Sequence, residues 1–560
     1  MIENGRRPPP DAGAAEIVTA LARAGTRALF GLPGGGPNLD VVGAGAAAGL
    51  RFVLTHGEAA AAIMAATYAD LTGSPGAVVV TRGPGLASAA NGIAHAALDR
   101  LPVVVIADTV RSAEADRISH QRLDLAALGR SVAKAVVTIG GSQARDAAAD
   151  AVRLALAPPP GPVIALMDDS ATPPAPGPGS VPGGTADPAG PDDQDLARLA
   201  RALDAARRPV VLLGAGAIPY TGPIRAALVG SGIPALHTYR ARGIVPDAAA
   251  EAAGLVTGGT MEWPLLAAAD LIIGLGVDEA EMIPAPWPYP APTMLVAGFP
   301  ATPGPATYFT GARALRVPLA AAAELLTAGH GHDWPPDVGR DTRLGIGRRL
   351  AEAASAAPGT LAPQQVAATA RARLPHDCIA TVDAGAHMLA VMPLWEVAQP
   401  QQLLISSGLA TMGFALPAAI AAALCAPGQP VVAFTGDGGL SMTLAEIETA
   451  VRLALRIVVI VFNDAALSLI KIKQRPAGQG GGEAVDYGPV SYTRAAEAMG
   501  AAGAAVRTET ELAEALDVAL RRGGPTVIDA RVDPSSYPLI MELSRGEAGR
   551  QPAVVHRPQG

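Results

Sequence analysis

The stretch VVAFTGDGGL, residues 431–440, joins an apolar run to a glycine-rich turn that contains Asp437. A second apolar run, residues 457–462, ends at the pair Asn463 and Asp464. Short apolar runs bounded by turn residues are typical of strands buried in a parallel sheet. Parallel strands present their carboxyl ends at one edge of the sheet, where open α/β sheets bind ligands. The sequence therefore predicts that Asp437 lies beside Asn463 and Asp464 at a ligand site.

The chemistry of these side chains indicates the kind of ligand. Carboxylate and amide oxygens suit a hard divalent cation such as Mg²⁺, which usually also takes phosphate oxygens. Gly438 and Gly439 have no Cβ atom, so their amides could approach phosphate groups closely. We therefore expect a diphosphate held through a metal ion. The alternative for the glycine turn alone is an ordinary strand-to-helix turn with an aspartate cap.

The composition is that of a large protein with several buried cores. The chain has 560 residues, of which 50% are hydrophobic and 16% are charged. No long stretch is apolar throughout, and residues 1–13 lack the apolar core of a signal peptide, so we expect no membrane partner and a cytoplasmic location. Cys378 and Cys425 are too few for a disulfide framework. The net charge of −8, without a dense basic block, argues against nucleic acid as a partner.

The chain divides into three segments in which strand candidates alternate with alanine-rich helical stretches. The first covers residues 1–170 and is followed by 171–193, whose Pro and Gly content is typical of a linker. The second covers 194–327, and 328–360 contains a linker and a helix before the third segment, 361–560. Strands that alternate with helices form parallel sheets. We therefore predict an α/β fold with three doubly wound parallel-sheet domains.

The order of GDG, a helix-sized segment and an Asn-Asp pair resembles the thiamine diphosphate (ThDP) signature of the pyruvate decarboxylase and acetolactate synthase superfamily. FGLPGG at 30–35, TRGPG at 81–85 and SSGLATMGFALPAA at 406–419 also resemble motifs of that family. The resemblance covers nearly the whole chain and is weakest in the second segment. It implies a pyrimidine-binding, a central and a diphosphate-binding domain, with ThDP and Mg²⁺ as cofactors.

The resemblance implies most of the cofactor contacts in the third segment. Asp437, Asp464 and the backbone carbonyl of Ala466 would bind the metal, with Asn463 as an alternative to Asp464. Met412 would hold the two cofactor rings in a bent arrangement and so orient the reacting groups before the reaction. The other implied contacts with the cofactor are the carbonyl of Ala410 together with Gly34, Gly385, His387, Gly436, Gly438, Gly439 and Leu467.

Glu58 lies in LTHGEAA, residues 54–60, where a predicted strand meets a predicted helix. The resemblance implies that its carboxylate bonds to the aminopyrimidine ring and so promotes removal of the C2 proton of the cofactor. The alternative is an ordinary first-turn carboxylate that interacts with the helix dipole. Gln121 would be an active-site amide. His120 would be either a catalytic proton donor or a loop histidine.

The helix expected after Asp464 offers candidate contacts with a substrate. Leu469 and Ile470 would shape an apolar pocket. Lys471 or Lys473 could meet a substrate carboxylate, or both lysines could lie on a solvated face.

The second segment contains one glycine pattern, Gly214-Ala215-Gly216, after a predicted strand. A lone GxG pattern is weak evidence for a dinucleotide site. The arginine-rich flavin motif of acetolactate synthases is absent from this segment, so FAD is not expected.

The resemblance implies an enzyme that decarboxylates a 2-oxo acid and transfers the resulting enamine to an acceptor. The alternatives are a simple decarboxylase that releases an aldehyde and a catalytically inactive partner protein with the same fold. The family builds its site between two chains, which implies a homodimer or a dimer of dimers. Glu58 of one chain would then face Asp437 of the other across the interface.

Overall fold

The computed structural model describes residues 12–114, 116–168, 177–178, 191–282, 287–296, 309, 311–329, 331–474 and 482–546. The chain forms two compact units, Met1–Gly183 and Gly184–Gly560. Most of the predicted linker 171–193 lies outside the described residues. Within the described part of the chain, no helix is both long enough and apolar enough to cross a membrane.

The first unit contains one sheet with the strand order β2-β1-β3-β4-β6-β5-β7. Its pairs are parallel except for the short β5–β7 pair. The strands are β1 (Ala28–Leu32), β2 (Arg51–Leu54), β3 (Gly76–Val80), β4 (Val103–Asp108), β5 (Ala135–Ile139), β6 (Val163–Met167) and β7 (Gly177–Pro178). The helices are α1 (Ala12–Arg23), α2 (Pro37–Ala47), α3 (Glu58–Thr72), α4 (Pro84–Leu98), α5 (Leu125–Val132) and α6 (Ala144–Leu156), with 3₁₀ turns at Ser112–Glu114 and Gly141–Gln143.

The second unit begins with a six-stranded parallel sheet of order β10-β9-β8-β11-β12-β13. The strands are β8 (Pro209–Leu213), β9 (Ala235–His237), β10 (Ala252–Leu255), β11 (Leu271–Leu275), β12 (Thr293–Val296) and β13 (Arg313–Leu315). The helices are α7 (Asp193–Ala205), α8 (Thr221–Leu228), α9 (Trp263–Ala268), α10 (Leu319–Thr327) and α11 (Val338–Glu352), with 3₁₀ turns η3 (Ala215–Tyr220) and η4 (Glu279–Glu281).

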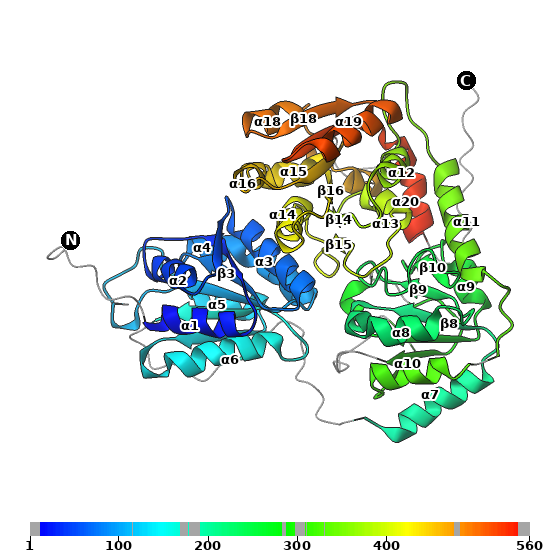
Figure 1. Cartoon of the computed structure of the whole chain (residues 1–560), viewed down its shortest axis with the longest axis horizontal. Coiled ribbons are helices and arrows are strands. Elements are labelled where there is room, and N and C mark those ends of the chain that lie inside the picture. Colours follow the sequence, from blue (N-terminus) through cyan, green and yellow to red (C-terminus); the bar gives the residue numbers. More distant parts are fainter. Residues whose placement is uncertain are drawn as a thin grey trace. The chain divides into compact units, whose positions relative to one another are not determined.

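A third sheet of order β15-β14-β16-β17-β19-β18 completes the second unit, and all its pairs are parallel. The strands are β14 (Ile379–Val382), β15 (Leu403–Ile405), β16 (Val431–Gly436), β17 (Ile457–Asn463), β18 (Ala502–Val506) and β19 (Thr526–Arg531). The helices are α12 (Pro363–Arg373), α13 (Met388–Leu394), α14 (Ala415–Cys425), α15 (Asp437–Thr443), α16 (Glu446–Arg452), α17 (Ser468–Lys473), α18 (Tyr492–Ala498), α19 (Glu509–Arg521) and α20 (Tyr537–Arg545), with 3₁₀ turns at Gly482–Ala484 and Pro534–Ser536. Figure 1 draws this part of the chain in yellow-green to red.

The predicted α/β architecture of three doubly wound parallel sheets is confirmed. The two apolar runs that suggested it are neighbouring strands, because β16 pairs with β17 along its whole length. Every residue of β17 is buried, as expected for a central strand covered on both faces. The register places Gly436 opposite Phe462. Asp437 and Asp464 therefore follow neighbouring strand ends at the same edge of the sheet.

A buried ion pair links the second and third sheets into one unit. Arg242 bonds to Asp247, and each side chain is only 2% exposed. Arg242 also donates to the carbonyl of Trp395 at 2.8 Å, and Asp247 accepts from the amide of Val397 at 2.8 Å. The buried pair therefore bonds to the backbone of the segment that precedes β15, within the same compact unit.

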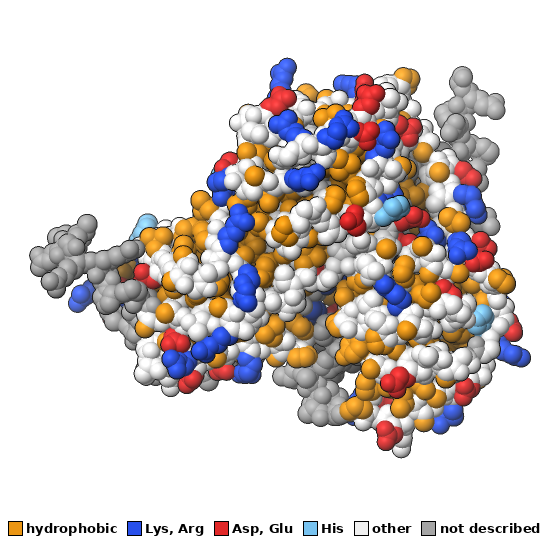
Figure 2. Space-filling view, viewed as in Figure 1, with side chains coloured by type: hydrophobic (Ala, Val, Ile, Leu, Met, Phe, Trp, Pro, Cys, Tyr) orange, Lys and Arg blue, Asp and Glu red, His pale blue; other side chains and the backbone are white. Residues whose placement is uncertain are grey.

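Charged side chains are interspersed on the surface of the second unit. Figure 2 shows Lys and Arg side chains and Asp and Glu side chains mixed over the visible face of that unit. The expectation that nucleic acid is not a partner stays a prediction, and this mixed distribution agrees with it.

Candidate active site

A cavity of about 290 Å³ lies at the carboxyl edge of the third sheet, where β16 and β17 end. The cofactor contacts predicted in the third segment all line it: Gly385, His387, Ala410, Met412, Gly436, Asp437, Gly438, Gly439, Asp464, Ala466 and Leu467. Folding thus brings together residues that are spread over much of the third segment. The assignment of these residues to a cofactor stays a prediction, but their shared location is a finding.

Two carboxylates face this cavity. Asp437 is buried, and its Oδ1 atom accepts a bond from the amide of Gly438 at 2.7 Å. Burial raises the pKa of Asp464 to about 6, and the nearby negative charge of Asp437 adds to the rise. The hydroxyl of Ser468, which donates to Asp464 at 2.5 Å, opposes it. Two carboxylates that repel one another out of water are best stabilised by a bound cation.

One carboxylate oxygen of this pair is available to bind a metal ion. The Oδ2 atom of Asp437 is buried and has no hydrogen-bond partner among the described residues. No cluster of three or more His, Cys, Asp or Glu side chains suited to a metal is present in the described part of the chain. A cation here would therefore use Asp437 and Asp464, a backbone carbonyl such as that of Ala466, and oxygens of a ligand or water. The residues present fit Mg²⁺ with a diphosphate.

Asn463 has a different environment from Asp464. Its side-chain amide donates to Asp529 at 2.8 Å, and its side-chain oxygen accepts from Arg531 at 2.9 Å. Asn463 does not line the cavity, whereas Asp464 does. The geometry therefore favours Asp464 as the metal ligand, and Asn463 ties β17 to β19.

Two alanines near the cavity have strained backbones. Ala410 and Ala465 have φ values of 51° and 58°, in the left-handed region that residues with a Cβ atom rarely adopt. Ala410 lines the cavity, and Ala465 separates Asp464 from Ala466. Strain of this kind is retained where the surrounding structure needs a particular backbone orientation. It supports backbone roles for Ala410 and Ala466.

Asp383 is a site-organising residue whose role the sequence did not reveal. It is buried, and it accepts bonds from the hydroxyl of Thr435 at 2.6 Å and the amide of Ala415 at 2.7 Å. A Cβ atom on Gly439 would lie 2.1 Å from its carboxylate. Gly439 is therefore needed for packing against Asp383. Only the aspartate at the end of an apolar strand hinted at this arrangement.

His387 lines the cavity as a neutral ring. It is buried, and its ring stacks on that of Phe462 with 5.3 Å between the centroids. Burial lowers the pKa of His387 to about 4. Its Nε2 atom has no partner among the described residues. The ring can therefore take part in a hydrogen bond with a bound group without adding a charge.

Met412 lies against the glycine turn. Its terminal methyl group would be 3.3 Å from a Cβ atom on Gly438, and Leu467 would be 3.1 Å from it. The three residues thus meet at one wall of the cavity, and a side chain at position 438 would crowd that wall.

Helices α17 and α20 form another wall. Leu469, Ile470 and Lys473 from α17 line the cavity, as do Tyr537 and Arg545 from α20. Lys471 instead forms an ion pair with Asp486, with 2.7 Å between Nζ and Oδ1. Arg545 was missed from the sequence, because an arginine at the end of the last helix carries no motif.

The first unit holds the other predicted residues. Glu58 is half-buried at the first position of α3, and Gly57 is the N-cap of that helix. Gln121 and His120 are exposed, and Gln121 has a φ value of 56°. A Cβ atom on Gly83 would lie 2.6 Å from the carbonyl oxygen of Gln121. The structure thus brings Gln121 against the TRGPG turn.

Gly34 is confined by packing within the first unit. Its amide donates to the side chain of Asn38 at 2.8 Å. A Cβ atom on Gly34 would lie 2.3 Å from the hydroxyl of Thr81. Any larger residue at this position would therefore displace the neighbouring turn.

The glycines of the Gly214-Ala215-Gly216 turn pack against another turn. A Cβ atom on Gly214 would lie 2.3 Å from the Cα atom of Val277, and one on Gly216 would lie 2.9 Å from the carbonyl oxygen of Gly276. Close packing between the two turns explains these glycines without a bound nucleotide.

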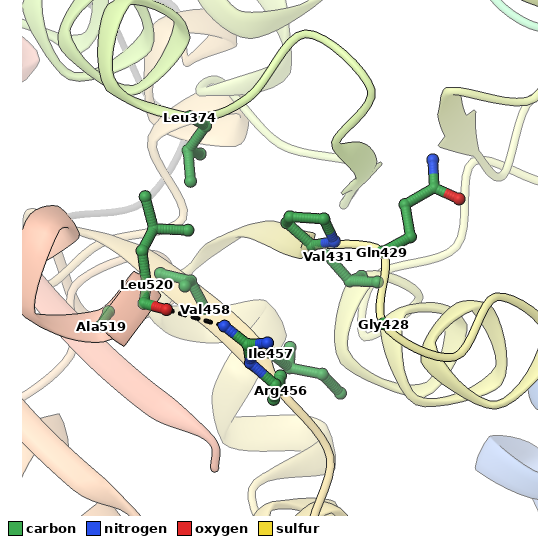
Figure 3. Close-up of a pocket in the computed structure, with 10 residues that line it drawn as sticks. Leu374, Gly428, Gln429, Val431, Arg456, Ile457, Val458, Ala519 and Leu520 are labelled. Carbon is green, nitrogen blue, oxygen red and sulfur yellow. Dashed lines mark hydrogen bonds between the residues drawn. The ribbon is translucent and has the colours of Figure 1, made fainter. Parts of the chain in front are cut away.

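A second pocket of the third sheet is too small for a cofactor. It lies at the opposite edge, where β16 and β17 begin, and has a volume of about 20 Å³. Figure 3 shows Arg456 beside Leu520, to whose carbonyl oxygen it donates at 2.8 Å. The space suits a single water molecule.

Comparisons with known proteins agree with this geometry. Models of the thiamine pyrophosphate enzyme N-terminal TPP binding domain, central domain and C-terminal TPP binding domain match residues 11–128, 196–295 and 383–530. A catabolic acetolactate synthase of Raoultella terrigena is 31% identical, over 94% of this chain and 96% of its own length. The chain belongs to the thiamine pyrophosphate enzyme family.

Further relatives place this ThDP enzyme within the family. An acetolactate synthase of Bacillus subtilis (strain 168) is 29% identical over 93% of both chains. The fold is also that of the ThDP-dependent 4-hydroxybenzoylformate decarboxylase of Rhodococcus jostii RHA1, with a TM-score of 0.75, 21% identity and coverage of 93% of this chain and 99% of that one. The protein is a ThDP-dependent, acetolactate synthase-like enzyme of the 2-oxo acid decarboxylase and carboligase type.

Proposed function

We propose that this enzyme uses ThDP and Mg²⁺ to decarboxylate a 2-oxo acid and to transfer the remaining fragment to an acceptor. ThDP, when bound, supplies an electron sink for the loss of CO₂. The observation that carries the Mg²⁺ part is the unpartnered, buried Oδ2 atom of Asp437 beside Asp464. In this proposal the two carboxylates and the carbonyl of Ala466 bind the metal.

The other residues orient the cofactor and handle its proton. The amides of Gly438 and Gly439 would face the phosphates, and Met412 would fix the angle between the rings. Glu58, at the first position of α3, would bond to the pyrimidine ring through its side-chain carboxyl group.

The outcome favoured by the residues is carboligation. The turn at positions 34–36 contains only glycine, and Ile470 in the cavity wall is apolar, so neither place offers a proton donor. The acetolactate synthase relatives agree with this choice. Simple decarboxylation is the second candidate, because the exposed His120 could protonate the fragment.

We also propose that two chains complete the site, in a homodimer or a dimer of dimers. Glu58 of one chain would serve the same cofactor as Asp437 of the other. A cytoplasmic location is part of the proposal, and the free thiols of Cys378 and Cys425 agree with a reducing compartment.

The decisive experiment reconstitutes the protein with ThDP and Mg²⁺ and measures CO₂ release from a panel of 2-oxo acids, with products identified by mass spectrometry. Release of CO₂ with formation of a larger 2-hydroxy ketone or 2-hydroxy-2-alkyl acid product supports carboligation. An aldehyde as the only product supports the second candidate. No release from any acid would overturn the proposed reaction.

A further inference from the structure

The wall formed by α17 and α20 contains two cations. Lys473 is the last residue of α17, and Arg545 is the last residue of α20. The two helices pack against one another, and both side chains line the cavity. The wall that would face a substrate is therefore positively charged at two places.

Lys473 differs from its neighbour Lys471 in what it contacts. The ammonium group of Lys471 is paired with Asp486 and does not line the cavity. Lys473 makes no ion pair with any residue in the described ranges, although it is exposed to the cavity. Its charge is therefore available to a ligand, and Lys471 provides a control on the same helix.

Arg545 also has a buried hydrogen-bond donor without an acceptor. Its Nε atom is buried and has no hydrogen-bond partner among the described residues. The guanidinium bonds to the hydroxyl of Tyr239, which is a neutral group. Because a guanidinium has five N–H donors, this bond leaves donors for a carboxylate.

Glu262, an acidic residue near Tyr239, forms no ion pair with Arg545 within the described residues. Glu262 lies close to Tyr239, but its own loop holds its carboxylate. Glu262 accepts bonds from the amides of Thr257 at 2.7 Å and Gly258 at 2.6 Å, and from the hydroxyl of Tyr289 at 3.1 Å. These bonds all end on the Oε1 atom of Glu262, and its Oε2 atom accepts from the hydroxyl of Thr257 at 3.1 Å.

Apolar residues accompany the two cations. Ile470 and Lys473 are three positions apart on α17 and so share a face of that helix. Leu469 and Ile470 line the cavity together with Lys473. An apolar surface that ends in a cation suits a short carbon chain that carries a carboxylate.

We infer that Lys473 and Arg545 form a subsite for a carboxylate that the reaction retains. This inference rests on the proposed function. The retained carboxylate belongs either to a dicarboxylic 2-oxo acid donor, at the end remote from the carbonyl group, or to a 2-oxo acid acceptor. Both sources share one chemistry, a carboxylate on a short carbon chain, so one subsite serves either.

Binding of probes that do not react tests the subsite independently of turnover. Pentanoate and pentanamide have the same length and differ in one negative charge. Calorimetry on the ThDP- and Mg²⁺-loaded protein should show tighter binding of pentanoate, by about tenfold, as expected for one charge-assisted hydrogen bond. Arg545→Gln and Lys473→Met should each reduce this preference several-fold. Arg545→Lys should retain part of it, and Lys471→Met should leave it unchanged.

Turnover then distinguishes the two sources. If the variants lower kcat/KM for 2-oxoglutarate but not for 2-oxopentanoate, the carboxylate belongs to the donor. If they lower the use of pyruvate relative to acetaldehyde as acceptor, it belongs to the acceptor. Equal binding of pentanoate and pentanamide by the unchanged protein, or a preference that survives both substitutions, would overturn the subsite. Failure of CO₂ release with an intact pentanoate preference would instead overturn the proposed reaction.

Discussion

The carboxylate of Glu281 accepts a hydrogen bond from the backbone amide of Ala215, with 2.9 Å between the two atoms. Its other oxygen accepts a bond from the hydroxyl of Thr238 at 2.7 Å. The amides of Gly214 and Gly216 donate to carbonyl groups at the carboxyl end of β11. The turn is therefore already bonded to a buried carboxyl group of the protein at the place where a glycine-rich turn would hold a pyrophosphate.

This contact predicts that the central domain does not bind FAD. The amides of residues 214–216, which would hold the phosphates, are already bonded within the protein. Protein purified without added flavin should show no visible flavin absorption, and no flavin should be released by denaturation. Glu281→Gln, which replaces the carboxyl group by an amide of similar shape, should also remain colourless. A stoichiometric yellow chromophore in the unchanged protein would contradict the prediction.

Substitution of the proposed metal ligands should abolish the dependence of ThDP binding on Mg²⁺. We expect Asp437→Ala and Asp464→Ala to weaken ThDP binding by about 100-fold or more, since even changes outside the ligand shell of a metal site lower affinity by roughly 10–100-fold. Titration calorimetry with and without Mg²⁺ measures this.

Asn463→Ala is the matched control for the metal ligands. It removes the donor to Oδ1 of buried Asp529, whose Oδ2 atom keeps the amide of Tyr492, so the free energy of unfolding should fall by about 1–3 kcal/mol. Its ThDP affinity should change much less than that of Asp464→Ala. If Asn463→Ala weakened ThDP binding more than Asp464→Ala did, Asn463 would be the metal ligand.

Glu58→Gln tests the proposed proton role in the first unit. The rate of CO₂ release should fall by about 10²–10⁴-fold, the usual contribution of a general acid or base, while ThDP affinity changes little. Asp146→Asn, which removes another first-turn carboxylate from a helix of this unit, should leave the rate unchanged. If Glu58 only interacts with the helix dipole, both variants would lose about 0.3–1 kcal/mol of stability and keep their activity.

Asp383 should give the protein a pH-dependent stability. Burial raises the pKa of Asp383 from 3.8 to about 6 in the folded protein. The folded state therefore binds the proton more tightly, and this contribution is complete below pH 3.8 and lost as the pH rises through 6. Asp383→Asn cannot lose a proton there. As the pH rises from 4 to 7, urea unfolding should show that the free energy of unfolding of the variant increases relative to that of the unchanged protein. A difference between the two free energies that does not change with pH would contradict the prediction.

The sequence predicted the three sheets and one cluster of residues because these depend on local patterns. The apolar runs of β16 and β17 indicate buried strands, and the glycine turn with Asp437 indicates where they end. The likeness to ThDP enzymes added Met412 and Ala410, which a pattern of hydrophobic residues alone would have placed in the core.

Other features depend on contacts between distant parts of the chain. The packing of Gly439 against Asp383 and the place of Arg545 in the cavity wall arise only when the third sheet is assembled. Lys471 is excluded as a cavity residue because it pairs with Asp486, which comes later in the chain, beyond the end of α17. Spacing along one helix could not separate the two lysines.

The bond between Arg242 and Asp247 bears on how the chain can be divided. A fragment that begins at residue 361 would leave Trp395 and Val397 without the charged groups that they contact, and it would expose the apolar surface beneath them. A fragment that begins at residue 184 would keep both partners. A graft of the cavity onto another protein should therefore bring the central sheet with it, so that Trp395 and Val397 keep these partners.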